Sequence, residues 1–110
     1  FDHVFYLVGN HEFYNSHHKN DNNDEKPHTV QEQLKWLKQV CEERPNLYFL
    51  EQTSVEINGV LLLGTTLWSH IPPETVKDAR FSMNDYHLSY LEGKKDQVIP
   101  MTPSFTNQWH

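Results

Sequence analysis

The sequence has few of the residues on which several classes of protein depend. Cys41 is the single cysteine among 110 residues, which excludes an intrachain disulfide and a structural zinc site built on thiolates. No apolar run approaches the roughly 20 residues that a membrane-spanning helix needs, so no membrane partner is expected. A lone thiol is typical of a reducing compartment, and we expect a cytoplasmic location.

Positive charge is also scarce. Nine Lys and Arg stand against fifteen Asp and Glu, which leaves a net charge of −6 at pH 7. Nucleic-acid binding is therefore not expected, because it requires a basic stripe. The aromatic fraction of 13% is nevertheless too high for a disordered chain, and 110 residues make one domain at most.

Hydrophobic patterning predicts strands and helices in alternation. Thr29 and Glu32 form a capping box that opens a helix, and Pro45 ends it. Asn58-Gly59 supplies the two positive-φ residues of a type I′ hairpin turn. The order of elements fits an α/β layered fold. The expected elements are a strand over 4–8, a helix over 29–44, a strand over 47–50, a hairpin over 53–57 and 60–63, a helical stretch over 74–86, and a helix that starts at 102–103.

Three details of this pattern carry further expectations. The helix over 29–44 places Val30, Leu34, Leu37 and Cys41 on one apolar face. The arm over 60–63 is apolar on both faces, so we expect it to lie inside a sheet. The chain opens in a strand, and a helix begins close to its last residue. We therefore expect residues 1–110 to be an internal piece of a single domain.

The segment Gly9-Asn10-His11-Glu12, directly after an apolar strand, resembles the third metal-binding block of the calcineurin-like metallophosphoesterases. Such sites hold two metal ions about 3.5–4 Å apart around a phosphate. The resemblance covers nearly all of the chain. The segments that extend it are Glu12-Phe13-Tyr14, Leu63-Gly64-Thr65-Thr66-Leu67-Trp68-Ser69 and Met83-Asn84-Asp85-Tyr86.

The resemblance implies a fold, a reaction and residue roles. The intact domain would be a four-layer αββα fold, and this chain a partial β-sandwich flanked by helices. Two divalent ions (Mn, Fe or Zn) would hydrolyse a phosphomonoester or phosphodiester in a small-molecule or protein substrate. Asn10 would be a metal ligand, and His11 the catalytic residue that stabilises charge or protonates the leaving oxygen. Glu12 would orient the turn rather than bind metal, and Gly9 would let the backbone turn sharply.

Several residue blocks of the family are missing. The upstream Asp-x-His and Gly-Asp-x-x-Asp blocks and the downstream Gly-His-x-His block do not occur in these residues. We therefore expect the 110-residue chain to be inactive by itself. The alternative is an inactive fragment or pseudo-enzyme that acts as a binding module.

Other polar and aromatic residues leave alternatives open. His70 follows an apolar strand and either faces a substrate pocket or lies in a loop. Trp68 and Tyr86 line that pocket or are buried in the core. A polar tract over 15–28 is a solvated loop or an adventitious metal site. The side chains concerned are His17, His18, His28, Asp21, Asp24 and Glu25.

Overall fold

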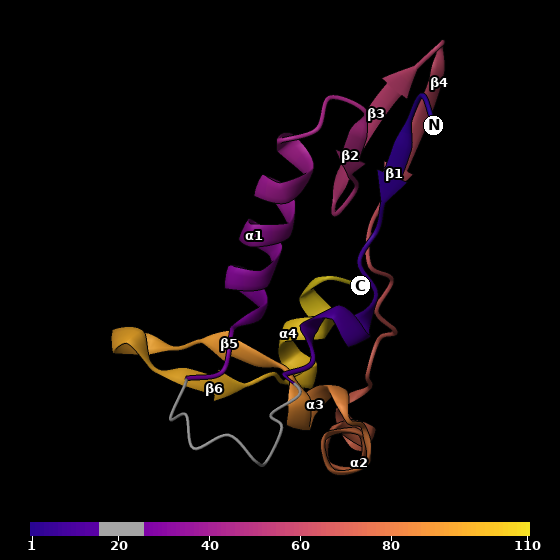
Figure 1. Cartoon of the computed structure of the whole chain (residues 1–110). Helices are drawn as coiled ribbons and strands as arrows, with labels where there is room; N and C mark the ends of the chain where they lie inside the picture. The colour runs from indigo at the N-terminus through magenta and orange to yellow at the C-terminus, as the bar shows by residue number, and fades with distance from the viewer. Residues whose placement is uncertain (16–25) are drawn as a thin grey trace.

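The computed structural model describes residues 1–15 and 26–110, and it is a mixed α/β structure (Figure 1). The α/β class expected from the sequence is therefore confirmed. The elements are β1 (Val4–Tyr6), η1 (Asn10–Phe13), α1 (Val30–Glu42), β2 (Leu47–Phe49), β3 (Thr53–Ile57), β4 (Val60–Gly64), η2 (Pro73–Thr75), α2 (Val76–Ser82), α3 (Asp85–Leu88), β5 (Tyr90–Glu92), η3 (Lys94–Asp96), β6 (Val98–Pro100) and α4 (Pro103–Gln108).

The first part of the chain is a strand–helix–strand unit. β1 pairs in parallel with β2, and α1 lies between them in sequence and packs against β2. The predicted capping box is confirmed. The Thr29 hydroxyl accepts from the Glu32 backbone N–H at 3.2 Å, and the Glu32 carboxylate accepts from the Thr29 N–H at 2.8 Å. The predicted apolar face is confirmed as well: Val30 and Cys41 are buried, and Leu34 and Leu37 pack against the core.

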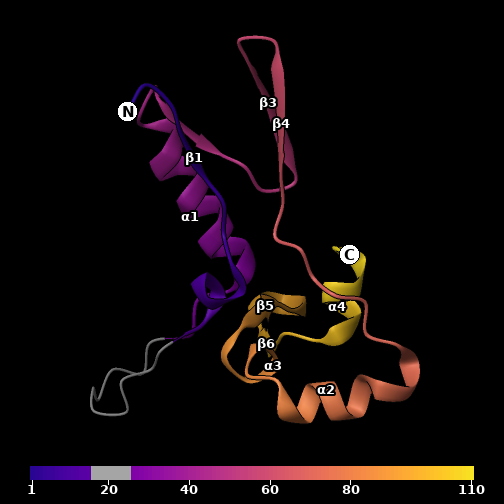
Figure 2. The same ribbon diagram turned by 90° about the vertical axis from the view of Figure 1, so that its right-hand side faces the viewer.

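The predicted hairpin forms from β3 and β4, with Ile57 opposite Val60. Its turn residues Asn58 and Gly59 have φ of 53° and 77°, which confirms the positive-φ turn. The expectation that the second arm lies inside a sheet is wrong. Among the described residues β4 pairs with β3 alone, so it is an edge strand, and its Leu63 side chain is 75% exposed. Figure 2 shows the hairpin projecting away from β1 and α1.

The helical stretch expected over 74–86 is interrupted. Met83 has an extended backbone (φ −94°, ψ 127°), which ends α2 and leaves α3 as a separate turn that begins at Asp85. β5 and β6 form an antiparallel hairpin over a stretch that the pattern left unassigned. α4 begins as predicted, with the Thr102 hydroxyl accepting from the Phe105 N–H at 3.3 Å.

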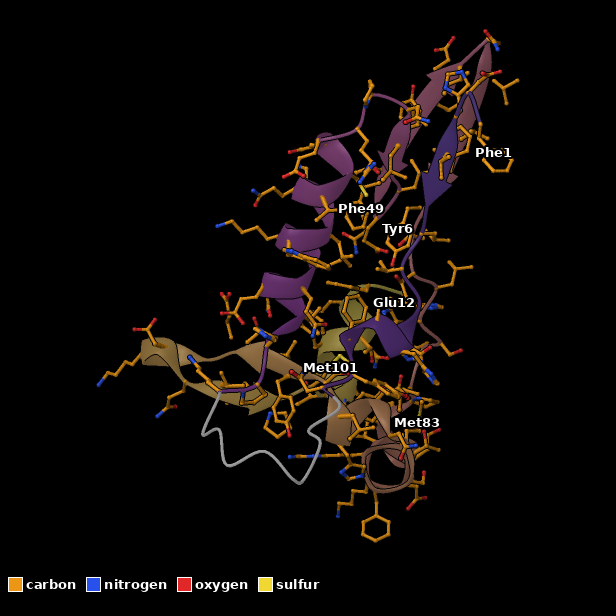
Figure 3. The ribbon with its side chains drawn as sticks, viewed as in Figure 1. Phe1, Tyr6, Glu12, Phe49, Met83 and Met101 are labelled. Carbon is orange, nitrogen blue, oxygen red and sulfur yellow. The ribbon has the colours of Figure 1, made fainter. Side chains whose placement is uncertain are left out.

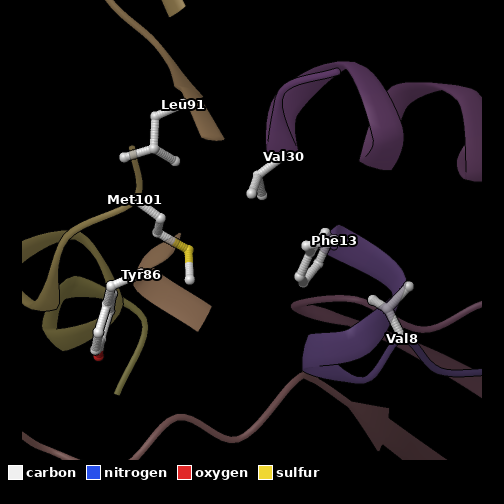
Figure 4. Packing of buried hydrophobic residues seen from close by; sticks show 6 residues of the cluster. All are labelled: Val8, Phe13, Val30, Tyr86, Leu91 and Met101. Carbon is white, nitrogen blue, oxygen red and sulfur yellow. The ribbon is translucent and has the colours of Figure 1, made fainter. Parts of the chain in front are cut away.

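The hydrophobic core gathers side chains from η1, α1, α3 and β5, and from the residues that follow β1 and β6 (Figure 4). It is formed by Val8, Phe13, Val30, Tyr86, Leu91 and Met101. Phe13 and Met101 are fully buried, so the turn that carries the Asn-His pair is anchored directly on the core. In the part of the chain that the structure covers, no helix has the length and apolarity to cross a bilayer.

Candidate functional site

The Gly9-Asn10-His11-Glu12 turn leaves the carboxyl end of β1 and forms the short helix η1. The Glu12 carboxylate accepts from the Gly9 N–H at 2.7 Å and so closes the turn on itself. Tyr6 and Phe49, stacked on the paired strands, lie on one side of Glu12, and Met101 lies on the other (Figure 3).

The expected reason for glycine at position 9 is wrong. Gly9 has φ −100° and ψ 177°, an extended conformation open to any residue. A Cβ at Gly9 would instead lie 3.0 Å from the carboxylate oxygen of Glu12. The small residue therefore leaves room for the side chain that closes the turn.

Asn10 is held by a carboxylate that comes from far along the chain. Its Nδ2 donates to Oδ1 of Asp85 at 2.7 Å, across 75 positions of sequence. Asp85 is the first residue of α3 and is 6% exposed. Among the described residues it forms no ion pair, since Lys38–Glu42 is the one salt bridge found there. A buried carboxylate and an amide therefore meet directly beneath the turn.

His11 is exposed, and its ring stacks on Tyr14 with centroids 4.5 Å apart and an interplanar angle of 28°. The Tyr14 hydroxyl lies 3.4 Å from Nδ2 of Asn10. Burial raises the pKa of the Tyr14 phenol, and the nearby Asp85 carboxylate raises it further. One tyrosine thus lies against both residues for which the sequence predicts a chemical role.

A second long-range contact fixes the strand end that precedes the turn. The buried Thr66 hydroxyl lies 2.8 Å from the Val8 carbonyl oxygen and 2.5 Å from Oε2 of Glu51. The Thr66 N–H also donates to that Glu51 oxygen, at 2.8 Å. Since Val8 immediately precedes Gly9, this contact ties the start of the turn to the residues that follow β2 and β4.

A cavity of about 460 Å³ opens beside the turn, and Asn10, Asp85, Trp68 and Tyr86 all line it. Tyr86 is also a core residue: it is 3% exposed, and its hydroxyl pairs with the Thr106 hydroxyl at 3.0 Å. The indole N–H of Trp68 is buried and has no hydrogen-bond partner among the described residues. Tyr86 thus belongs to the core and Trp68 packs against it, and both also line this cavity.

His70 does not line this cavity. It is exposed, and its ring lies 5.6 Å from the ring of His110. The predicted adventitious metal site falls mostly on His17, His18 and their acidic neighbours, which lie outside the described residues. His28, which is described, uses its backbone N–H to donate to the Asn15 side chain at 2.8 Å.

The donor set fits a metal centre only in part. Within residues 1–15 and 26–110, no group of three His, Cys, Asp or Glu side chains is placed to hold a metal ion. The Asn10 Oδ1 is a hard, neutral oxygen of the kind that divalent cations accept, and its amide is already oriented by Asp85. These residues can offer one ligand and do not make a two-ion centre.

Sequence reasoning missed three residues that shape this site: Asp85, Thr66 and Glu51. Asp85 and Thr66 lie inside segments that extend the family resemblance, but no spacing rule links either of them to Asn10. Asp85 and Thr66 act across large sequence separations, 75 positions for Asp85 and 58 for the bond from Thr66 to Val8, and Glu51 bonds to Thr66 across 15.

Comparison with known proteins adds one relative and no function. No family model matches the chain, and no solved structure matches it. Uncharacterized protein L509 of Acanthamoeba polyphaga mimivirus is 31% identical over 111 residues, covering 100% of this chain and 36% of L509. The chain thus spans about a third of the length of the curated relative that it matches.

Proposed function

We propose that this chain belongs to a metal-dependent phosphoester hydrolase of the calcineurin-like type and carries one corner of its active centre. The observation that supports this most is the Gly-Asn-His-Glu turn at the carboxyl end of a parallel strand, with Asn10 on a cavity and its amide held by a buried carboxylate. Carboxyl ends of parallel strands are where α/β folds bind ligands.

The roles are those that the family resemblance implies, and the side-chain chemistry suits them. Asn10 offers Oδ1 as a neutral ligand to one of two divalent ions (Mn, Fe or Zn), which when bound would supply Lewis-acid chemistry. His11 is exposed at the edge of the turn, where an imidazole donates a hydrogen bond or a proton to a phosphoryl oxygen. Glu12 holds the turn closed. The remaining ligands would come from outside the described residues.

The bare face of the β1–β2 sheet supports the layered part of this proposal. α1 covers one face, while Phe5 and Tyr48 stack on each other at 5.4 Å on the other, with His3 beside them. Phe5 is 40% exposed, although parallel sheets are normally covered on both faces. A second β layer over this face would complete the αββα arrangement.

We further propose a cytoplasmic location, which the lone buried thiol of Cys41 supports.

Metal binding tests the proposal directly. We would titrate Mn²⁺ into the ¹⁵N-labelled chain and follow paramagnetic broadening of the Asn10 and His11 signals. The background would carry His17→Ala and His18→Ala, so that the His-rich segment does not mask the site. Broadening centred on Asn10 that Asn10→Ala removes is the expected result. Asn84→Ala is the matched control, because Asn84 is exposed and forms no side-chain capping bond.

A non-catalytic binding module is the second candidate, and the incomplete ligand set of the described residues favours it. Under either proposal we expect no hydrolysis of an aryl phosphate by the chain alone. The two differ in the titration: a binding module gives no Mn²⁺ effect at Asn10. Broadening that is absent, or that survives Asn10→Ala, overturns the hydrolase proposal.

A further inference from the structure

We propose that Asp85 is a positioning residue, which locks the side-chain amide of Asn10 in the orientation that presents Oδ1 to the cavity. This inference rests on the proposed function for its purpose, because the presented oxygen is the ligand offered to the metal ion. It concerns a residue to which neither the family motif nor any spacing rule assigns a role.

The first step is the hydrogen-bond chemistry of the two side chains. A carboxylate only accepts hydrogen bonds, whereas an Asn amide donates through Nδ2 and accepts through Oδ1. Asp85 therefore selects the NH₂ group of Asn10, as the 2.7 Å contact from Nδ2 to Oδ1 shows. Rotating the amide by half a turn would place two acceptors against each other, so Oδ1 is directed away from Asp85.

The second step is burial. Asp85 is 6% exposed, and no described Lys or Arg forms an ion pair with it. A buried carboxylate without a cationic partner needs hydrogen bonds in its place, and the bond from Asn10 supplies one. The contact is also anchored, because Asp85 begins α3 and the next residue, Tyr86, lies in the core with its hydroxyl bonded to Thr106.

The third step is the open side of the amide. The described residues donate no hydrogen bond to Oδ1 of Asn10, while its Nδ2 reaches both Asp85 and, at 3.4 Å, the Tyr14 hydroxyl. Asn10 and Asp85 both line the same cavity. Among the described residues the amide nitrogen thus has two partners and the amide oxygen has none, so the oxygen is free to accept a further ligand.

An exchanged pair tests the orientation. Asn10→Asp alone brings two carboxylates together and should lower the urea midpoint strongly, whereas Asp85→Asn alone keeps a neutral acceptor and should lower it less. The double variant Asn10→Asp/Asp85→Asn exchanges donor and acceptor and should recover most of the loss caused by Asn10→Asp. A double variant no more stable than Asn10→Asp overturns the proposal, because additive effects mean that the two side chains do not bond to each other.

Metal affinity supplies the readout that a purely structural role would not move. Loss of a residue that orients a metal ligand typically weakens metal binding by about 10–100-fold. We therefore expect Asp85→Ala to weaken Mn²⁺ binding at Asn10 at least tenfold at a temperature where the variant stays folded, with Asn84→Ala unchanged. An affinity within twofold of the parent chain overturns the positioning role.

The two proposals fail separately. A parent chain that shows no Mn²⁺ effect at Asn10 overturns the hydrolase proposal, and the exchanged pair then still decides whether Asp85 orients the amide. Metal binding that requires Asn10 but ignores Asp85 leaves the hydrolase proposal standing and overturns this one.

Discussion

Replacing Thr66 by Val removes one buried hydroxyl while keeping the volume and branching of the side chain. The hydroxyl lies 2.8 Å from the Val8 carbonyl oxygen and 2.5 Å from a carboxylate oxygen of Glu51. Thr66 is 7% exposed, so water cannot replace either contact without opening the structure. The substitution therefore removes the one hydroxyl proton that these two acceptors share, and it creates no cavity.

The size of the effect follows from these two contacts. A hydrogen bond between neutral groups contributes about 0.5–1.5 kcal/mol, and one to a charged group about 1.5–3 kcal/mol. The hydroxyl has one proton to share between its two acceptors, so the full sum is not reached. We expect Thr66→Val to lower the free energy of unfolding by about 1.5–3 kcal/mol, the range for one hydrogen bond to a charged group.

Urea unfolding followed by the fluorescence of the three tryptophans measures this loss. With a denaturant slope of about 1.5–2 kcal/mol/M, the unfolding midpoint should fall by about 1–2 M. Thr66→Ser, which keeps the hydroxyl and loses a methyl group, should cost only about 1 kcal/mol. Thr65→Val is the neighbouring control, since its partly buried hydroxyl makes only longer contacts, 3.2 Å to Glu51 and 3.5 Å to the Thr66 carbonyl oxygen.

A loss below about 0.5 kcal/mol for Thr66→Val would refute the reasoning, because surface substitutions without partners give changes of that size. A Thr66→Ser loss equal to that of Thr66→Val would also refute it, since the methyl group and not the hydroxyl would then be responsible.

Three other predictions test separate parts of the fold. Thr29→Ala removes the cap of α1 and should cost about 1 kcal/mol, read from the same urea midpoint, whereas an unchanged midpoint contradicts the capping role. Cys41 is 4% exposed and burial raises its thiol pKa, so Ellman's reagent should label it slowly in buffer and rapidly in urea; fast native labelling would contradict its burial. The raised pKa of Tyr14 favours the neutral phenol in the folded state, so the stability it contributes is complete below the ordinary value of 10.0 and is lost as pH rises through the folded value. The urea midpoint should thus fall more steeply above pH 10 in the parent chain than in Tyr14→Phe, and equal slopes would contradict the assignment.

The elements that the sequence predicted well are those set by neighbours in the chain. The capping box at Thr29 and the Asn58-Gly59 turn depend on residues at most three positions apart, so local chemistry decides them. The helical stretch expected over 74–86 is instead broken at Met83, which has an extended backbone. The turn that follows brings Asp85 into contact with Asn10. The Asn10–Asp85 contact spans 75 positions of sequence, and helix periodicity carries no trace of it.

The residues of the candidate site divide in the same way, into those fixed by sequence neighbours and those that act through long-range contacts. Asn10, His11 and Glu12 share one turn, and a pattern four residues long was enough to single them out. Their supports are Asp85 and Thr66, which reach the turn from different elements and on different sides, one under the Asn10 amide and one at the Val8 carbonyl. Neither support is a nearest neighbour in sequence, so only the folded chain reveals it.

These two supports also predict how stability and ligand presentation are related. Thr66 acts on the backbone one residue before the turn, so its loss should weaken folding and displace Asn10 and His11 together. Asp85 acts on one side-chain amide, so its loss should weaken metal binding at Asn10 more than it disturbs His11. Comparing Thr66→Val with Asp85→Ala for chemical-shift changes at both positions separates the two effects. Equal chemical-shift changes at His11 in both variants would mean that the turn responds as one rigid unit. Asp85 would then not act selectively on the Asn10 amide.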